Sequence, residues 1–375
     1  MSHDLAQRSG TSLSKDESAK LMEHVKWASE RLRNAKSEIA KDVWNQDRMI
    51  EMVLATLVAG GNVLAEGMPG LAKTLTVKAV ARASGLDFKR IQFTPDLQPI
   101  DLTGSEVLNK TDNSWAFRPG PLFGQMILAD EINRAGQKTQ SAMLEAMEEK
   151  QITVDGTTRV LSRPFHVLAT QNPVDQDGTS PLPEAQADRF MTKLIFTYPD
   201  RDADKKIMLS SSGTDANIEE LLSLRDQFNK TGDAQFDLTR LPDPDRQSRV
   251  QQAFTAHDLI IMQKIARHLP LSEGVVNTAV DVIRMLRPQS NDDKFIQKNI
   301  AFGPSPRALI AFALVAKAKA LMDGRIENGQ LAPRKEDIID IMEPVLQHRM
   351  ALHFQKDKDV EFKQVFDHVR TKLKL

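Results

Sequence analysis

The chain has 375 residues, which is enough for about two to three domains of ordinary size. Its 50 Lys and Arg residues balance its 51 Asp and Glu residues, so the net charge of −1 provides no overall field that would attract nucleic acid, although a local basic patch remains possible. The absence of Cys excludes disulfides, Cys-ligated zinc and thiol nucleophiles.

The first 40 residues are expected to form a polar tail followed by an amphipathic helix. Ser14 and Glu17 have the S-x-x-E spacing of a capping box, which predicts that the helix begins there. An apolar seam follows at alternating spacings of four and three residues. Its members are Leu21, Val25, Ala28, Leu32, Ala35 and Ile39. We expect the seam to pack on the chain's own next domain, with a contact between subunits as the alternative.

Between residues 53 and 196, short apolar strands alternate with helical stretches, which predicts a parallel sheet with helical crossovers. The expected strands are 62–66, 88–93, 125–130, 165–171 and 192–196. The dipeptide Asp155-Gly156 predicts an additional hairpin at 152–161. His166 lies inside an expected strand, and we interpret it as a core residue rather than a metal ligand.

After Tyr198-Pro199 the strand pattern stops and helical patterns take over. The polar stretch 210–252 is expected to be a long insertion with one helix at 219–229. Helices are then expected at 256–268, 273–287, 305–323 and 335–349. The predicted organisation is a tail and helix (1–40), an α/β core (41–200), a linker with insertion (201–254), a helical domain (255–354) and a C-terminal tail (355–375).

No segment of the sequence predicts a membrane anchor. The first residues lack the apolar stretch of a signal peptide. The longest apolar run, at 308–316, has nine residues, whereas a membrane span needs about 20. We therefore expect a cytoplasmic protein.

The segment GMPGLAKT at 67–74 lies between an expected strand and an expected helix. In this arrangement, backbone N–H groups and a helix N-terminus cradle phosphates. Lys73 would reach the β- and γ-phosphates, and the Thr74 hydroxyl would ligate Mg²⁺. Ala72 replaces the second glycine of the generic motif and would cost about 1–2 kcal/mol if that position is left-handed. A Gly/Pro turn beside a chance Lys-Thr is the alternative.

A second motif is the expected strand that ends in Asp130 and Glu131. An Asp at this position can hold a metal through water, and the adjacent Glu can polarise an attacking water. Together with the loop at 67–74, this pair predicts nucleotide hydrolysis, with binding without turnover as the alternative.

Further segments resemble the MoxR family of AAA+ ATPases, within the helix-2-insert group. These segments are FTPDLQPIDLTG at 93–104, FRPGPLF at 117–123, LADEINRA at 128–135, ATQNP at 169–173, PLPEAQADRF at 181–190 and GPSPRA at 303–308. The resemblance spans residues 40–210 and 255–352. It implies an AAA+ P-loop core of three α/β/α layers with a five-stranded parallel sheet, followed by a helical lid domain.

The resemblance also implies residue roles. Asn172 would be sensor 1, Arg189 the arginine finger for a neighbouring subunit, and Arg307 the sensor 2 that contacts its own subunit's γ-phosphate. Arg134 would act at the subunit interface or form a surface ion pair. Asn45, in the adenine segment, stands where the family usually carries Gly. The implied nucleotide contacts are Val43, Gln46, Gly67, Met68, Pro69, Gly70, Leu71, Ala72, Lys73, Thr74, Leu75, Asp130 and Arg307, with Thr74 and Asp130 also at the metal.

The implied function is an ATP-driven remodelling motor that forms a hexameric ring and acts on protein clients. The family also suggests a partner with a von Willebrand factor A domain and a role in metal-cofactor insertion. The segments 102–118 and 152–161 would contact clients or brace the ring. The alternatives are a nucleic-acid motor or clamp-loader-like ATPase and a nucleotide-dependent binding switch. The hairpin at 152–161 argues against nucleic acid, because it carries Arg159 but neither Lys nor an aromatic residue.

Overall fold

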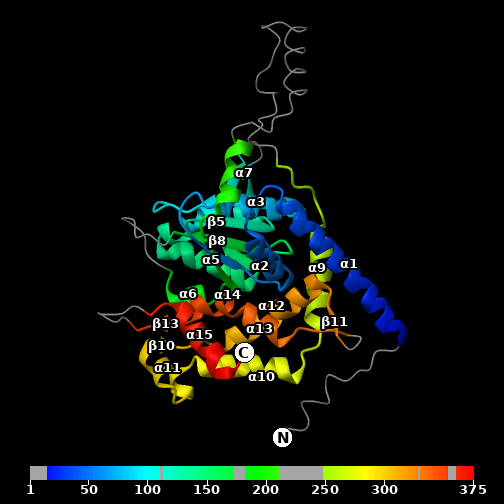
Figure 1. Ribbon diagram of the computed structural model, residues 1–375. Coiled ribbons are helices and arrows are strands. Elements are labelled where there is room, and N and C mark those ends of the chain that lie inside the picture. Colours follow the sequence, from blue (N-terminus) through cyan, green and yellow to red (C-terminus); the bar gives the residue numbers. More distant parts are fainter. Residues whose placement is uncertain (1–14, 110–112, 173–181, 212–247, 328–329, 354–359) are drawn as a thin grey trace.

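The five predicted core strands form one parallel sheet, and the computed structural model in Figure 1 describes it within residues 15–109, 113–172, 182–211, 248–327, 330–353 and 360–375. The strand order is β2-β5-β8-β1-β9, and all neighbours are parallel. The bounds are Val63–Glu66 (β1), Phe88–Gln92 (β2), Met126–Asp130 (β5), His166–Gln171 (β8) and Thr192–Ile195 (β9). The α/β prediction is confirmed.

The two faces of the sheet pack into two separate hydrophobic clusters. Successive residues of β5 alternate between them, since Met126 and Leu128 join one cluster while Ile127 and Ala129 join the other. The first face is covered by α1 (Lys15–Ile39), α2 (Asp47–Val58) and α3 (Lys73–Ser84). The second is covered by α5 (Gln137–Glu149), with the short α4 (Pro99–Thr103) and the 3₁₀ turn η1 (Pro121–Phe123). This gives the three α/β/α layers.

Helix α1 packs on its own chain, as expected. Its seam residues from Val25 to Ile39 are buried, and the helix contacts α3 of the core and α12 of the helical domain. Figure 1 shows α1 running diagonally past both parts of the molecule. Ser14 lies outside the described residues, and the helix begins at Lys15.

Two antiparallel hairpins extend from the sheet. The predicted hairpin is confirmed as β6 (Gln151–Val154) and β7 (Thr157–Val160), with Asp155 and Gly156 at φ 51° and 75°. These positive φ values are those of a two-residue hairpin turn. The other hairpin, β3 (Gly104–Asn109) and β4 (Ser114–Pro119), was not predicted. Short elements flank the core strands at η2 (Ile132–Arg134) and α6 (Glu184–Ala187).

The helical domain follows the core. Helix α7 (Arg201–Ser211) leads into the predicted insertion, whose expected helix at 219–229 lies outside the described residues. The helices that follow are α9 (Ala256–His268), α10 (Glu273–Met285), α11 (Lys294–Asn299) and α12 (Pro306–Asp323), with the 3₁₀ turn η4 (Pro288–Ser290). Two small antiparallel pairs accompany them, namely β10 (Ile300–Phe302) with β13 (Ala351–Leu352) and β11 (Ile326–Glu327) with β12 (Gln330–Leu331).

Three expectations for this domain were wrong. The helix expected at 273–287 ends at Met285, because a residue before a proline such as Pro288 avoids the helical region. The single helix expected at 335–349 is instead α13 (Lys335–Asp340), α14 (Met342–Leu346) and η5 (Gln347–Arg349). Pro344 lies in the first turn of α14 and has no N–H to donate to the carbonyl of Asp340, so the helical hydrogen bonding is interrupted at Ile341, between α13 and α14.

The segment expected as a C-terminal tail is the third correction. Residues 362–373 form helix α15 (Phe362–Leu373), which packs on α10 and α14. Val365, Phe366 and Val369 share one helical face and are buried there. Among all described residues, no helix has the length and apolarity needed to cross a bilayer.

Candidate nucleotide site

The loop between β1 and α3 has the backbone that a phosphate-binding loop needs. Gly70 and Ala72 adopt left-handed φ values of 83° and 57°. A side chain at Gly67 would place its Cβ 2.8 Å from the carbonyl oxygen of Phe196, so the loop can pass β9 only with glycine at this position. The sequence correctly identified Ala72 as an unusual residue, because its left-handed conformation costs about 1–2 kcal/mol. The N-terminal N–H groups of α3 face this loop.

Lys73 lies at the first turn of α3 with its ammonium over the loop. Its Nζ donates to the carbonyls of Gly67 (2.5 Å) and Gln171 (3.4 Å). Burial lowers the pKa of Lys73, and the nearby carboxylates of Asp130, Glu131 and Glu66 act in the opposite direction. Neutral carbonyls are weaker acceptors than phosphate oxygens, so this ammonium is well placed to exchange them for a phosphate.

Asp130 ends β5 beside Thr74, as the motif predicted. Its Oδ1 accepts a hydrogen bond from the hydroxyl of Thr170 (2.6 Å), and its Oδ2 lies 3.5 Å from the Thr74 hydroxyl. Arg90 on β2 also donates to Oδ2, from NH2 at 2.7 Å and from Nε at 3.1 Å. The sequence analysis did not identify Arg90. The register of β2 against β5 places Arg90 diagonal to Asp130, so a prediction of that register would have identified the pair.

Glu131 follows directly in a left-handed conformation, with φ 56°. Its N–H donates to the Thr170 hydroxyl (2.8 Å), which therefore orients both acidic residues. Its carboxylate accepts from Gln92 Nε2 (3.0 Å) and from Arg134 NH1 (2.8 Å). Of the two roles left open for Arg134, the structure contains the ion pair. Gln92 was not identified from the sequence.

Asn172 directly follows β8, which lies in the sheet between β5, the strand that ends in Asp130, and β1, the strand that leads into the phosphate loop. Its Oδ1 is buried and has no hydrogen-bond partner among the described residues. A buried unpaired acceptor is rare in native proteins and calls for a water or ligand that donates to it. The adenine segment lies beside β9, where Gln46 Nε2 donates to the carbonyl of Thr197 (3.4 Å). Asn45 has a left-handed φ of 54°. Asn tolerates this conformation better than most residues, so it can stand where the family usually has Gly.

These groups fit a magnesium nucleotide better than a free metal ion. No described cluster of three or more His, Asp and Glu side chains could hold a metal. Thr74 and Asp130 would supply two oxygen ligands, and Mg²⁺ commonly completes such a set with phosphate and water oxygens. The unpaired Asn172 and the strained loop lie at this same carboxyl edge of the sheet.

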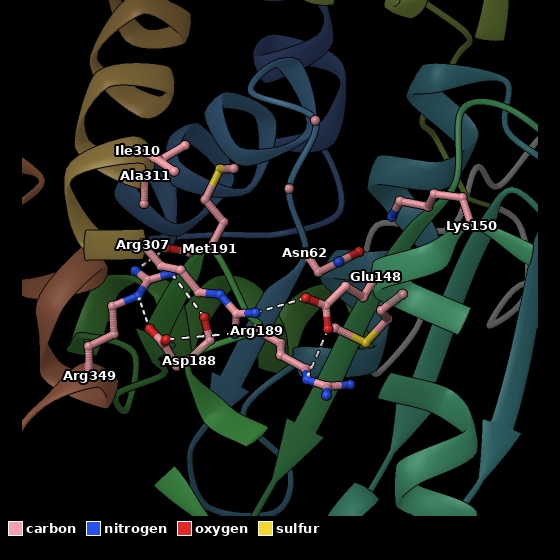
Figure 2. Close-up of a pocket in the computed structure, with 13 residues that line it drawn as sticks. Asn62, Glu148, Lys150, Asp188, Arg189, Met191, Arg307, Ile310, Ala311 and Arg349 are labelled. Carbon is pink, nitrogen blue, oxygen red and sulfur yellow. Dashed lines mark hydrogen bonds and ion pairs between the residues drawn. The ribbon is translucent and has the colours of Figure 1, made fainter. Parts of the chain in front are cut away.

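Arg189 and Arg307 lie together at the opposite, amino edge. Figure 2 shows both guanidinium groups beside Glu148, at 3.3 Å from Arg189 Nε and 2.8 Å from Arg307 NH2. The cavity there has a volume of about 220 Å³ and includes Asn62, which directly precedes β1. A four-residue strand separates this edge from the phosphate loop, a length of about 13 Å.

The structure places Arg307 at this amino edge, whereas the resemblance implied a contact with its own subunit's γ-phosphate. The N-terminus of α12 docks on the amino edge, because Ser305 Oγ donates to Asp188 Oδ2 (3.0 Å) at the N-cap. Arg307, two residues later, thus lies far from Lys73. Arg189 lies at the same amino edge, away from its own phosphate loop.

Comparisons with known proteins match both parts of the chain to AAA proteins. Residues 62–192 match the family model described as "ATPase family associated with various cellular activities (AAA)", and residues 293–367 match the AAA lid domain. The protein YeaC of Bacillus subtilis, uncharacterized, is 38% identical over 80% of this chain and 80% of its own. Chaperone MoxR1 of Mycobacterium tuberculosis is 35% identical over 86% of this chain and 76% of its own. The crystal structure of an ATPase candidate from Cytophaga hutchinsonii superposes with a TM-score of 0.76 at 34% identity, covering 93% of this chain and 96% of that one.

Proposed function

The chain belongs to the MoxR family of AAA+ ATPases, and we propose that it binds ATP with Mg²⁺ and hydrolyses it to ADP and phosphate as the motor of a protein-remodelling chaperone. The observation that carries the proposal is the convergence of motifs distant in sequence at one edge of the sheet. The strained loop, Lys73, the Thr74–Asp130 pair, Glu131 and the unpaired Asn172 all meet there.

Each of these groups has a distinct task in the proposed reaction. Lys73 and the loop N–H groups bind the β- and γ-phosphates, while Thr74 and Asp130 hold the metal directly or through water. Mg²⁺, when bound, neutralises the phosphate charge. Glu131 accepts a hydrogen bond from the attacking water, and Asn172 orients that water through its buried amide.

The place of Arg189 favours a homo-oligomeric ring. The guanidinium group lies at the amino edge, so it can reach a phosphate only if another subunit brings one there. We propose that neighbouring subunits complete each other's sites in this way, in a ring of six as in the family. Arg307, at the same edge, then belongs to the interface rather than to its own subunit's nucleotide.

The two hairpins are the proposed client-contacting segments. Trp115 on β4 and Val160 on β7 are 69% and 68% exposed, which suits apolar segments of an unfolded or partly folded protein. Arg159 joins the two hairpins, because its guanidinium group pairs with Glu106 (2.5 Å) and stacks on Phe117 at 3.8 Å. A partner with a von Willebrand factor A domain and a role in metal-cofactor insertion remain proposals from the family alone.

The Arg159 contacts also bear on the nucleic-acid alternative. The hairpin arginine is engaged within the chain by a carboxylate and a ring, so it is not free to bind a backbone phosphate. The binding-switch alternative differs from the motor only in whether turnover is needed, which the next experiment addresses.

The proposal is tested by measuring nucleotide binding and phosphate release separately. Lys73→Ala should lose tight ATP binding, since it removes a charge that meets the ground-state phosphates. Glu131→Gln should keep binding and lose about 10²–10⁴-fold in kcat, because Glu131 acts in the transition state. Glu149→Gln, at the exposed end of α5, is the matched control and should behave as wild type.

Near wild-type hydrolysis by Glu131→Gln would contradict the catalytic assignment. A Glu131→Gln variant that still releases a client at the wild-type rate would favour the binding switch.

A further inference from the structure

A chain of alternating charges connects the helical domain to Arg189. In order, it runs Arg189–Glu148–Arg307–Asp188–Arg349 (Figure 2). The successive nitrogen–oxygen distances are 3.3, 2.8, 3.8 and 2.8 Å. The two arginines at the cavity therefore share one carboxylate, which forms an ion pair with Arg189 through Oε2 and accepts a hydrogen bond from Arg307 through Oε1.

One end of this ion-pair chain is fixed. The Arg349 side chain is 3% exposed and lies at the junction of the helical domain with the core. Asp188 is held by Arg349 Nε (2.8 Å) and by the Ser305 hydroxyl (3.0 Å). The remaining Arg349 nitrogens donate to the backbone carbonyls of Val345, Asp188, Phe190 and Met191.

The other end is open. Arg189 uses Nε for Glu148, and its NH1 and NH2 form no hydrogen bond or ion pair with any described residue. Figure 2 shows these two terminal nitrogens directed away from the carboxylate. The NH1–NH2 edge of a guanidinium group is a fork that binds phosphate oxygens in pairs. A carboxylate on Nε therefore fixes the plane of the group without occupying that fork.

A single helix connects Glu148 to the loop of the same subunit that carries Glu131. Helix α5 begins three residues after Arg134, which pairs with Glu131, and it carries Glu148 in its last turn. Its 13 residues span about 20 Å, so it reaches from the carboxyl edge of the sheet to the amino edge.

We propose that Glu148 is the positioning residue of Arg189: it holds the guanidinium group with its fork toward the triphosphate of the neighbouring subunit. This inference rests on the proposed function, in which Arg189 acts on that triphosphate. Glu148 touches no phosphate itself, and it acts through Arg189. Arg307 and Asp188 extend the same support to the helical domain, so the orientation of Arg189 depends on how that domain is docked.

The test uses Glu148→Gln in the full-length protein, with Glu145→Gln as control. Glu145 lies one turn earlier on α5 and lines the neighbouring hollow, but within the described part of the chain it pairs with neither arginine. Glu148→Gln should lower kcat about tenfold, less than the 10³–10⁵ expected for loss of the arginine itself, with unchanged binding of a fluorescent ATP analogue to its own loop. Because Glu148 is 41% exposed, the variant should melt within a few degrees of the wild type.

Mixed rings separate positioning in trans from a defect in the variant's own site. Lys73→Ala subunits cannot hydrolyse ATP, but they carry an intact Glu148–Arg189 pair. Adding them to Glu148→Gln subunits should restore the rate per intact phosphate loop toward the wild-type value. Arg189→Ala mixed with Lys73→Ala is run beside it, because that mixture tests the proposed function alone.

The outcomes are distinguishable. If the Arg189→Ala mixture recovers activity and the Glu148→Gln mixture does not, the positioning role is overturned and the trans arrangement stands. If neither mixture recovers although mass spectrometry finds mixed rings, both fall. Unchanged kcat in Glu148→Gln, or an equal loss in Glu145→Gln, also overturns the positioning role.

Discussion

At the scale of single residues, three non-glycine positions with left-handed backbone lie around the proposed nucleotide site. Ala72, Glu131 and Asn45 all have φ between 54° and 57°, and each belongs to a different segment around the proposed nucleotide. Non-glycine residues in this conformation cost about 1–3 kcal/mol and are retained where the surrounding structure imposes them. The sequence indicated two of these positions, because Ala72 and Asn45 replace glycines of the motif or family. Nothing in the sequence indicated Glu131, since its conformation is set by Thr170 on another strand.

His166 is a buried residue whose two ring nitrogens form hydrogen bonds within the core. Its Nδ1 donates to the carbonyl of Gly61 (2.8 Å), and its Nε2 accepts from Gln263 (3.1 Å), which requires the neutral ring. Burial lowers the pKa of His166 to about 4. The interpretation of this residue as part of the core therefore agrees with its surroundings.

The lowered pKa predicts a specific pH dependence of stability. Between pH 6.5 and 4 the unfolded chain binds a proton on His166 that the folded chain does not, so the free energy of unfolding falls as the pH falls through this window. The total loss from this residue is about 3 kcal/mol. The free energy of unfolding of wild type and of His166→Asn is measured by urea denaturation from pH 7.5 to 4.5. The contribution of His166 is the difference between the two proteins in how steeply this free energy changes with pH. Parallel curves for the two proteins would contradict the prediction.

At the scale of elements, the sequence predicted the strands and helices whose apolar residues recur with the regular spacing of a buried face. The sheet strands and α1 belong to this class. The β3–β4 hairpin was missed because β4 is largely exposed and the sequence between the two strands has no Asn-Gly or Asp-Gly turn. The break at Ile341 was missed because the apolar pattern continues across it.

Helix α1 connects the core to the helical domain, and a substitution at one seam residue measures how much this packing contributes to stability. Leu32 is fully buried on α1, the helix that contacts both α3 and α12. Leu32→Ala should lower the free energy of unfolding by about 2–5 kcal/mol, since it leaves a cavity in this shared packing. The exposed Lys26→Ala on the same helix should change it by less than about 0.5 kcal/mol. Urea denaturation followed by circular dichroism measures both changes. Equal effects of the two substitutions would contradict the prediction that packing of the α1 seam stabilises the fold.

At the scale of the whole molecule, the site residues divide between two opposite edges of the sheet. Local motifs correctly brought Lys73, Thr74, Asp130 and Glu131 to one edge. They could not place Arg307, because its position depends on how the entire helical domain docks on the core through Asp188 and Arg349. Such docking joins residues more than 150 positions apart and leaves no periodic signal in the sequence.

This division predicts assembly that depends on nucleotide. A triphosphate bound at the carboxyl edge of one subunit gains contacts from Arg189 of the next, so ATP binds the assembled form more tightly and shifts the equilibrium toward it. Native mass spectrometry at micromolar protein should detect larger rings with Mg-ATP than without it. Lys73→Ala should show no shift, because its loop is empty. Arg189→Ala should bind ATP yet assemble less, because the contact from the second subunit is missing. A monomer in saturating Mg-ATP would contradict the ring, and a full shift in Arg189→Ala would mean that nucleotide promotes assembly through other contacts.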